Sequence, residues 1–237
     1  CLAVDGRFDH FKREIGAETA REAEFDSPFD FDRQARLFLP AMPDPRAPDY
    51  RAAVIEQAAE LIDASAGGAF LLCTSHAAVR EYGQALRERV DVPVLQQGEQ
   101  SKHALLHAFR TDGNAVLVGT QSFWEGVDVP GRALRLVMID RLPFLAPSDP
   151  LLRARVEHLK AQGLEPFRDY QIPHAAMTLK QGAGRLIRGT EDRGVLVIFD
   201  PRIHRTGYGK AFLNSLPPFP VETDRLPILS FLREVSA

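Results

Sequence analysis

Short apolar runs alternate with longer amphipathic stretches along most of the chain. The apolar runs are 69–73 (AFLLC), 93–95 (PVL), 115–118 (AVLV), 134–139 (LRLVMI) and 195–199 (VLVIF). Apolar residues recur with helical spacing in a stretch that begins at 49 and in 75–90, 101–110, 150–162 and 173–187. Buried strands that alternate with helices are typical of a parallel sheet covered on both faces. The pattern therefore predicts a single three-layer α/β/α domain with a mostly parallel sheet.

Less regular sequence lies on both sides of this alternation. At the start, 8–15 predicts a short helix, 23–26 a brief strand and 36–39 a strand, and the proline-rich 41–48 predicts an extended linker. At the end, 209–216 and 224–235 predict helices joined by a proline-rich segment. In the last of these, Leu226, Leu229, Leu232 and Val235 form an apolar face that we expect to pack on the domain.

Residues 181–188, QGAGRLIR, carry the most concentrated candidate chemistry. If they belong to one helix, Arg185 and Arg188 share a face, and Gln181 lies one turn earlier. Two guanidinium groups pointing the same way suit a phosphate chain, because each offers planar bidentate donors. Gly184 leaves room for a partner to approach. The alternative is a solvated helix face with two surface arginines.

Polar or proline-stiffened loops follow four of the predicted strands, at 74–76, 119–131, 140–150 and 200–202. Ligands of parallel sheets bind beyond the carboxyl ends of the strands, so we expect the unusual residues to gather at this edge. Thr74 and Ser75 follow the first of these strands. Ser75 suits the N-cap of the next helix, and the hydroxyls with nearby backbone N–H groups could also hold a nucleic-acid phosphate.

The segment 119–131, GTQSFWEGVDVPG, is dense in unusual residue types. Glu125 and Asp128 are three apart, and paired carboxylates suggest general acid–base chemistry. The sequence supplies no partnering histidine, so hydrogen bonds to a sugar or to basic side chains are favoured. Phe123 and Trp124 either pack in the core or offer a surface to nucleic-acid bases.

Composition narrows the class of protein. The net charge of −3 gives no global basic field, so any anion site must be a local cleft. No run approaches the roughly 18 apolar residues of a membrane span. Two cysteines, Cys1 and Cys73, are too few for a disulfide framework or a cysteine-ligated metal site. We expect a cytoplasmic protein in which Cys73 is a buried small hydrophobe.

The motif G-x-x-x-x-G-K-[ST], which cradles nucleotide phosphates, does not occur in the sequence. No acidic pair follows a predicted strand to hold magnesium. The sequence therefore has arginines that could bind a phosphate chain but lacks the loop that cradles one. This combination suggests half of a nucleotide site. It also begins without methionine, and we expect it to be part of a longer protein.

In their order along the chain, these segments resemble the second motor lobe of superfamily 2 DNA helicases of the DinG/XPD type. The segment 69–86 resembles helicase motif IV, 119–131 resembles motif V, and 181–188 matches the Q-x-x-G-R-x-x-R pattern of motif VI. The resemblance extends over about 22–216. It implies a RecA-like lobe at 22–237, with 1–21 as the connecting segment from a preceding lobe.

The family resemblance implies two RecA-like lobes with ATP and Mg²⁺ bound between them. The preceding N-terminal lobe of the same polypeptide would carry the phosphate loop, the magnesium-binding acids and a 4Fe–4S cluster, none of which this sequence can supply. The second partner implied is single-stranded DNA. The expected function is therefore that of a motor lobe in DNA repair or replication, inactive as an ATPase by itself.

The resemblance also implies roles for individual residues. Arg188 would be the arginine finger that stabilises charge on the transferred phosphoryl group, with Arg185 facing ATP and Gln181 orienting a phosphate or the attacking water. The remaining ATP-site residues would be Glu125, Gly126, Asp128 and Gly184, and the residues that hold DNA phosphates would be Thr74, Ser75, Thr120 and Gln121.

Two rival hypotheses come from other classes of protein. The first is a non-catalytic RecA-like module that binds nucleic acid or a protein partner. The second is an unrelated phosphotransferase that uses Arg185 and Arg188 as a clamp, for which the sequence offers no evident nucleophile or base.

Overall fold

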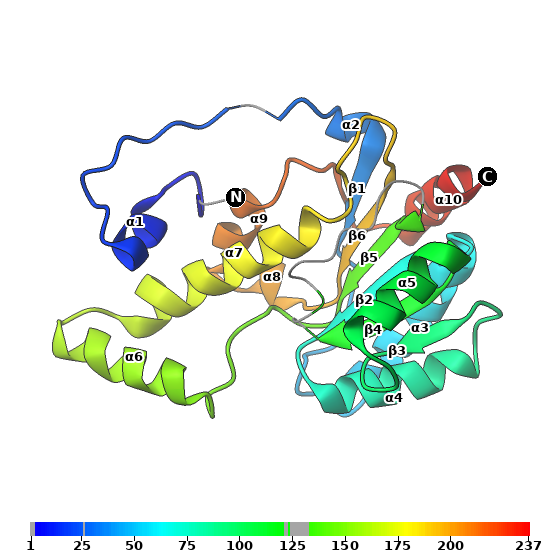
Figure 1. The fold of residues 1–237 in the computed structure, drawn as a ribbon, viewed down its shortest axis with the longest axis horizontal. Helices are drawn as coiled ribbons and strands as arrows, with labels where there is room; N and C mark the ends of the chain where they lie inside the picture. The colour runs from blue at the N-terminus through cyan, green and yellow to red at the C-terminus, as the bar shows by residue number, and fades with distance from the viewer. Residues whose placement is uncertain (1–2, 26, 121–122, 124–132) are drawn as a thin grey trace.

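A seven-stranded sheet forms the centre of the protein in the computed structural model, which describes residues 3–25, 27–120, 123 and 133–237. The strand order is β3-β4-β2-β5-β6-β1-β7, and every neighbouring pair is parallel. Helices cover the sheet along its length (Figure 1). The predicted α/β architecture is confirmed.

The strands are β1 (Ala35–Phe38), β2 (Ala69–Cys73), β3 (Val94–Gln96), β4 (Val116–Thr120), β5 (Leu136–Ile139), β6 (Gly194–Ile198) and β7 (Val221–Glu222). The helices are α1 (Asp9–Ile15), α2 (Phe31–Gln34), α3 (Tyr50–Ala64), α4 (His76–Arg87), α5 (Lys102–Asp112), α6 (Pro150–Ala161), α7 (Ile172–Ala183), α8 (Arg202–Arg205), α9 (Gly209–Ser215) and α10 (Arg225–Ser236), with a π-helical turn η3 (Phe167–Gln171). Within the described ranges, every helix is too short or too polar to cross a bilayer.

The strands are buried on both faces, and successive residues point into two separate cores. On β2, Phe70 and Leu72 pack in the core under α5, α7 and α9. Their neighbours Leu71 and Cys73 pack in the other core, under α3, α4 and α10. This division explains why the strands are continuous apolar runs, and it confirms the three layers.

Some terminal elements differ from the sequence prediction. Residues 23–25 form no strand, while α2, α8, η3 and β7 appear without having been predicted, because pieces of two to five residues carry too little periodicity. In α10 the buried face consists of Ile228, Leu229, Phe231 and Leu232. Leu226 is 70% exposed, so its predicted place on the packed face is wrong.

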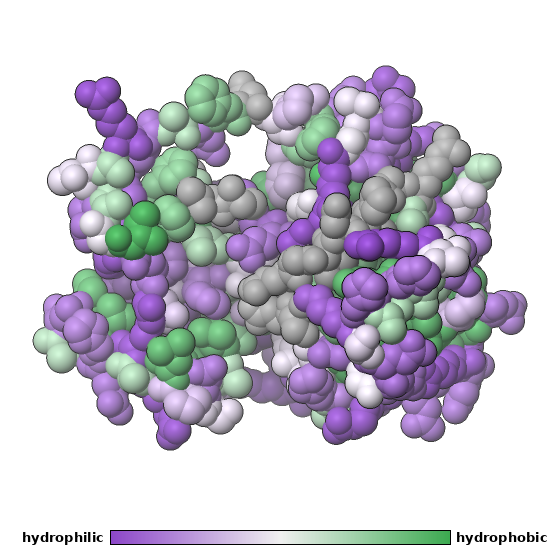
Figure 2. All heavy atoms as spheres, viewed as in Figure 1, coloured by the Kyte–Doolittle hydropathy of each residue, from purple (hydrophilic) through white to green (hydrophobic). Residues whose placement is uncertain are grey.

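The N-terminal segment before α2 crosses the face that carries α7 and α9 (Figure 1). Asp5 accepts from the Asn214 amide at 2.6 Å, and its backbone N–H donates to Ser215 Oγ at 2.9 Å. The surface is hollowed beneath this segment (Figure 2), where a cavity of about 720 Å³ has a mixed lining that includes Phe29, Phe219 and Lys180. The boundary expected from the sequence, between a connecting segment at 1–21 and the lobe at 22–237, stays a prediction.

The turn that leads into β2 depends on a tight approach at Gly67. Gly67 has φ +77°, and a Cβ there would overlap the Asn114 carbonyl. Gly163 has nearly the same backbone, with φ +76°, but open space around it. We expect Gly163→Ala to cost only the left-handed penalty of about 1–2 kcal/mol. Gly67→Ala should cost about 1–3 kcal/mol more, because the backbone must also shift.

Urea unfolding of the two variants measures this difference in the free energy of unfolding. Equal losses in the two variants would contradict the steric role of Gly67.

Candidate functional site

The loop after β2 presents two exposed hydroxyl residues, Thr74 and Ser75. Ser75 has extended backbone, and its Oγ accepts from Ala78 N at 3.2 Å, which caps α4 as predicted. Thr74 N donates to Asp140 Oδ1 at 3.1 Å. The start of α4 therefore presents hydroxyls and a helix N-terminus to solvent at the carboxyl edge of the sheet, a combination that suits a phosphate.

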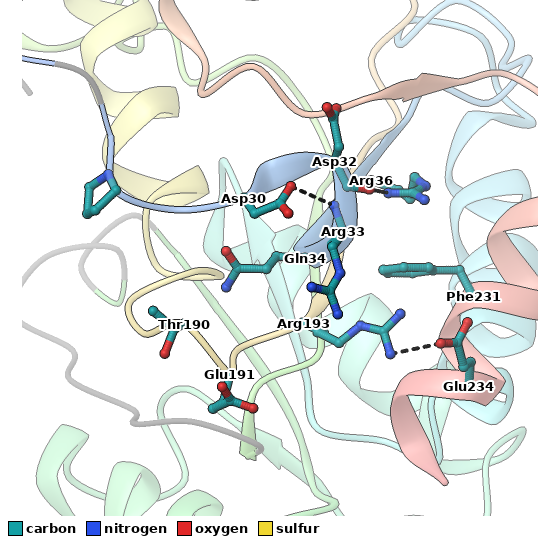
Figure 3. Close-up of a pocket in the computed structure, with 11 residues that line it drawn as sticks. Asp30, Asp32, Arg33, Gln34, Arg36, Thr190, Glu191, Arg193, Phe231 and Glu234 are labelled. Atoms are coloured by element: carbon teal, nitrogen blue, oxygen red, sulfur yellow. Dashed lines mark hydrogen bonds and ion pairs between the residues drawn. The ribbon is translucent and has the colours of Figure 1, made fainter.

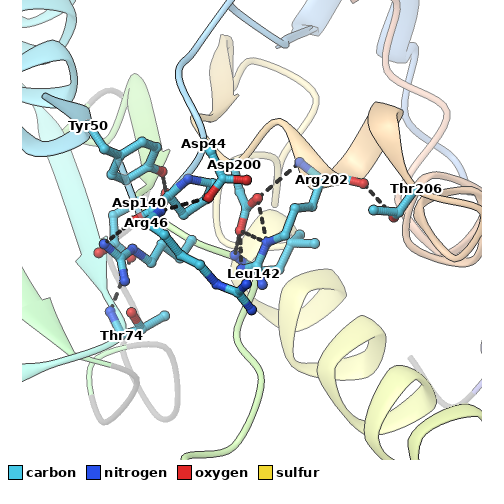
Figure 4. Close-up of polar contacts among 11 residues, drawn as sticks. Asp44, Arg46, Tyr50, Thr74, Asp140, Leu142, Asp200, Arg202 and Thr206 are labelled. Atoms are coloured by element: carbon cyan, nitrogen blue, oxygen red, sulfur yellow. Dashed lines mark hydrogen bonds and ion pairs between the residues drawn. The ribbon is translucent and has the colours of Figure 1, made fainter. Parts of the chain in front are cut away.

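Asp140 is a buried carboxyl that fastens this loop to the end of β5. Its backbone carbonyl accepts from the buried Tyr50 hydroxyl, and its side chain accepts from Thr74 N (Figure 4). Burial raises the pKa of Asp140 to about 7, against the opposing effect of Arg141 and of backbone N–H donors from Arg141 and Thr74.

A second buried carboxyl, Asp200, has the same task at the end of β6. It accepts from Leu142 N at 2.9 Å and from Arg202 Nη2 at 2.5 Å, with further contacts to Arg202 Nε (Figure 4). Asp140 and Asp200 thus tie the exits of β2, β5 and β6 together. Sequence reasoning noted both loops but missed this role, for which an aspartate directly after an apolar run was the available signal.

Thr120, the last residue of β4, is held by Gln97 from the loop after β3. Its N–H and Oγ1 donate to Gln97 Oε1 at 2.6 and 2.9 Å. Phe123 is 2% exposed, and its ring lies where a side chain on Gly119 would have to go, so the core interpretation of Phe123 is confirmed. The other motif V candidates, Gln121, Trp124, Glu125, Gly126 and Asp128, lie outside the described residues.

The motif VI arginines do not lie on a helix. α7 ends at Ala183, Gly184 is its C-cap, and Arg185 N donates to Gly182 O at 3.1 Å in a turn. The expected shared helix face of Arg185 and Arg188 is therefore wrong. The following Leu186 and Ile187 are both buried.

The segment from Arg188 to Asp192 is held rigidly where it leads into β6. Asp192 Oδ2 accepts from the N–H groups of Arg188 and Gly189, each at 2.8 Å. Gln34, directly before β1, donates to the carbonyls of Gly189 and Asp192 at 2.7 and 2.9 Å. Partial burial lowers the pKa of the half-exposed Arg188 guanidinium, an effect that Asp192 opposes. Sequence reasoning missed both Gln34 and Asp192.

The candidate residues therefore divide between two edges of the sheet. Thr74, Ser75 and Thr120 lie at the carboxyl ends of β2 and β4, whereas Arg188 approaches the amino ends of β1 and β6. A strand of five residues separates the edges by about 15 Å. The expectation that the unusual residues share the carboxyl edge is wrong for the arginines, because the chain after α7 must return to the start of β6.

A cavity of about 610 Å³ lies beside this segment, at the amino ends of β1 and β6 (Figure 3). Its described lining includes three arginines, Arg33, Arg36 and Arg193, and the four acids Asp30, Asp32, Glu191 and Glu234. Arg193 pairs with Glu234 at 2.9 Å, and Arg36 and Arg193 lie over the Phe231 ring. Since the acids offset the arginines, the cavity does not favour a polyanion.

No group of three or more His, Cys, Asp or Glu side chains that could hold a metal occurs in the described part of the chain. Cys73 is 1% exposed on β2, and burial raises the pKa of its thiol well above the ordinary value. It is the small buried hydrophobe that the sequence predicted.

The family model described as the helicase C-terminal domain matches residues 58–219. The chain belongs to this family. This helicase C-terminal domain is 47% identical over 232 residues to the ATP-dependent DNA helicase YoaA of Escherichia coli strain K12, covering 98% of this chain and 36% of that protein. It is 40% identical over 240 residues to the ATP-dependent helicase DinG of Mycobacterium tuberculosis strain H37Rv, covering 99% of this chain and 36% of that protein.

The chain thus spans about a third of the length of these relatives. A solved structure of an XPD helicase covers 81% of this helicase C-terminal domain, and 36% of that structure's own chain is matched, with a TM-score of 0.58 at 16% identity. At that identity the likeness concerns the fold, and it confirms the RecA-like architecture. The sequence resemblance to DinG/XPD helicases is confirmed.

The buried carboxyl of Asp140 makes the stability of this domain depend on pH. The native side chain keeps its proton up to a pH of about 7, whereas the unfolded one releases it near its ordinary pKa of 3.8. The native state therefore binds more protons between these values, and this group makes stability fall as pH rises, by at most about 1.4 kcal/mol per pH unit.

Asp140→Asn removes this ionisation while an amide oxygen can still accept from Thr74 N. We expect the stability of the variant relative to wild type to increase from about pH 4 to about pH 7, as measured by urea unfolding across this range. A difference that is constant with pH would show that Asp140 does not titrate there.

Proposed function

We propose that this chain is the C-terminal motor lobe of an ATP-dependent DNA helicase. The observation that carries the proposal is the alignment of 98% of the chain with only 36% of a relative named as such a helicase. The placement of motif IV and motif VI on opposite edges of one sheet supports it, because a motor lobe must hold a nucleic-acid strand and a nucleotide at separate places.

At the amino edge, Arg188 serves as the arginine finger and Arg185 as its ATP-facing neighbour. Both side chains are half-exposed, and the backbone around Arg188 is held by N–H groups that donate to Asp192 and by the Gln34 amide, which donates to the Gly189 carbonyl. A fixed backbone supports such a role, since positioned charge can contribute about 10³–10⁵ in the rate of phosphoryl transfer. Gln181 is exposed on the last turn of α7, where it would orient a phosphate or the attacking water.

Other residues would complete the nucleotide side. Gly184 is exposed, and a Cβ there would meet nothing closer than 3.4 Å, so this surface can be approached closely. The motif V resemblance alone supports including Glu125, Gly126 and Asp128 in the proposed ATP site. They would link the nucleotide to the bound strand.

ATP and Mg²⁺ would be shared with the N-terminal lobe of the same polypeptide. Bound ATP supplies the phosphoryl group whose transfer to water drives the motor. By the family resemblance, the Mg²⁺ ligands and the 4Fe–4S cluster would belong to the preceding lobe. The guanidinium groups of this chain fit the phosphate chain of the nucleotide, since they offer donors and no metal ligands.

At the carboxyl edge, Thr74, Ser75, Thr120 and Gln121 would hold backbone phosphates of single-stranded DNA. The exposed hydroxyls at the start of α4 and the buried carboxyls that fasten the loops beneath them support this assignment. Phosphate contacts carry no sequence information, so binding would be independent of sequence and weakened by salt. A protein that acts on DNA in this way would work in the cytoplasm, in repair or replication.

The first test is the ATPase activity of the 237-residue chain alone. We expect no DNA-stimulated hydrolysis, because the sequence lacks the phosphate loop that would cradle the nucleotide. Phosphate release with and without single-stranded DNA is the measurement. Turnover by the pure chain would contradict a composite site. Absence of turnover in the full-length protein as well would favour the non-catalytic module.

The second test is Arg188→Ala in the full-length protein. Hydrolysis should fall by about 10³ or more, while single-stranded DNA affinity changes little, because Arg188 lies at the opposite edge from the DNA contacts. Arg188→Lys should restore little, since lysine keeps the charge without the planar fork. Arg233→Ala, at an exposed position on α10, is the matched control and should leave hydrolysis unchanged. Normal turnover by Arg188→Ala would remove Arg188 from the finger role.

A further inference from the structure

Four aromatic side chains gather beyond the carboxyl ends of β5 and β6. Phe144 comes from the loop after β5, Phe167 from η3, and Tyr208 and Phe212 from the start and middle of α9. The rings of Phe144 and Phe167 are stacked, with centroids 5.6 Å apart and an interplanar angle of 24°. Tyr208 meets both of these rings edge-on, at 5.8 and 5.5 Å.

A cation completes this cluster from the β6 side. The Arg202 guanidinium carbon lies 5.7 Å from the centre of the Phe144 ring, and the fork is held in place by the buried carboxylate of Asp200. Phe167 is stacked on Phe144, and Arg202 lies within cation–π distance of the same ring; we call these three groups the aromatic column. The ion pair with the buried Asp200 anchors Arg202 at one end of the column, and the Phe167 ring forms the other end.

The column ends in solvent. Phe167 is 39% exposed, whereas Phe212, which fills the base of the cluster, is fully buried. The packing of the cluster is therefore complete without the outer part of Phe167. Exposed basic residues lie on the same elements: Arg168, which pairs with Asp169 at 3.2 Å, and His204, Arg205 and Lys210 on α8 and α9. An exposed aromatic ring on elements that also carry basic side chains is a combination that proteins use to bind single-stranded nucleic acid.

The column also lies on the same edge as the proposed phosphate contacts. The strand order β4-β2-β5-β6 places Thr120, Thr74, the Asp140–Phe144 loop and the Asp200–Arg202 segment in a row. Neighbouring strands are about 4.8 Å apart, so the row extends over about 14 Å, a span that a few nucleotides can bridge. A strand held at Thr74 and Thr120 can thus continue toward the column.

We infer that the aromatic column is a base-stacking site, in which an unpaired base of the DNA strand lies against the exposed ring of Phe167. This inference rests on the proposed function and extends it from phosphate contacts to base contacts. An unpaired base suits the site because its ring face is available, whereas bases within a duplex are already stacked on each other. Stacking tolerates any sequence, because every base has such a face.

The test compares two ligands that differ only in their bases. An oligothymidylate and an abasic oligomer of equal length present the same phosphates to the 237-residue chain. We expect the wild-type chain to bind the oligothymidylate about tenfold more tightly, within the range of base–aromatic stacking. Phe167→Ala should abolish this preference and leave both the abasic affinity and the salt dependence unchanged, since the phosphate contacts remain.

Matched variants separate stacking from general packing. Phe167→Leu keeps an apolar side chain and should also lose the preference, whereas Phe167→Trp should keep it. Phe25→Ala removes a phenylalanine that is 88% exposed in the N-terminal segment, and it should change nothing. Urea unfolding confirms that each variant is folded under the binding conditions.

Each outcome decides something distinct. A preference that survives in Phe167→Ala, or that is lost equally in Phe25→Ala, overturns the assignment to the column. Equal binding of both oligomers by the wild-type chain overturns base stacking but leaves the DNA-binding role in place. Failure to bind either oligomer at low salt removes the proposed DNA contacts, and the base-stacking site with them.

Discussion

Burial of the sheet on both faces is the constraint on which the rest of this structure depends. Every strand from β1 to β6 except the edge strand β3 is almost wholly apolar, because helices cover both sides. Backbone hydrogen bonds are satisfied between strands, so polar side chains have a place only where strands begin or end. The chemistry of this domain must therefore lie at the two edges of the sheet.

The two edges are organised differently. At the carboxyl edge, the buried side chains of Asp140 and Asp200 accept hydrogen bonds from backbone N–H groups and from Arg202. Burying a charged carboxylate is unfavourable unless such partners are supplied. For Asp140 the partners compensate only in part, and its pKa is therefore raised. These hydrogen bonds hold the loops after β2, β5 and β6 in one geometry, which the proposed DNA contacts need.

At the amino edge, the organising contacts come from a side-chain amide and one carboxylate. Gln34 and Asp192 fix the chain between α7 and β6 by its backbone, and the Arg185 and Arg188 side chains are half-exposed. The sheet between the edges is a packed and rigid body. In the proposed motor lobe, a displacement at one edge would therefore carry the other edge with it.

The sequence by itself determined the layers, the parallel strands and the family, because strand burial and motif order are local patterns. It also located Ser75 as a cap and Cys73 in the core. Only the tertiary structure decided where α7 ends, at Ala183 with Gly184 as its C-cap. It alone separated the arginines from Thr74 by the width of the sheet, and it alone assembled Phe144, Phe167 and Arg202. Contacts between residues far apart in the chain produce no periodic pattern in the sequence, so they are visible only in the tertiary structure.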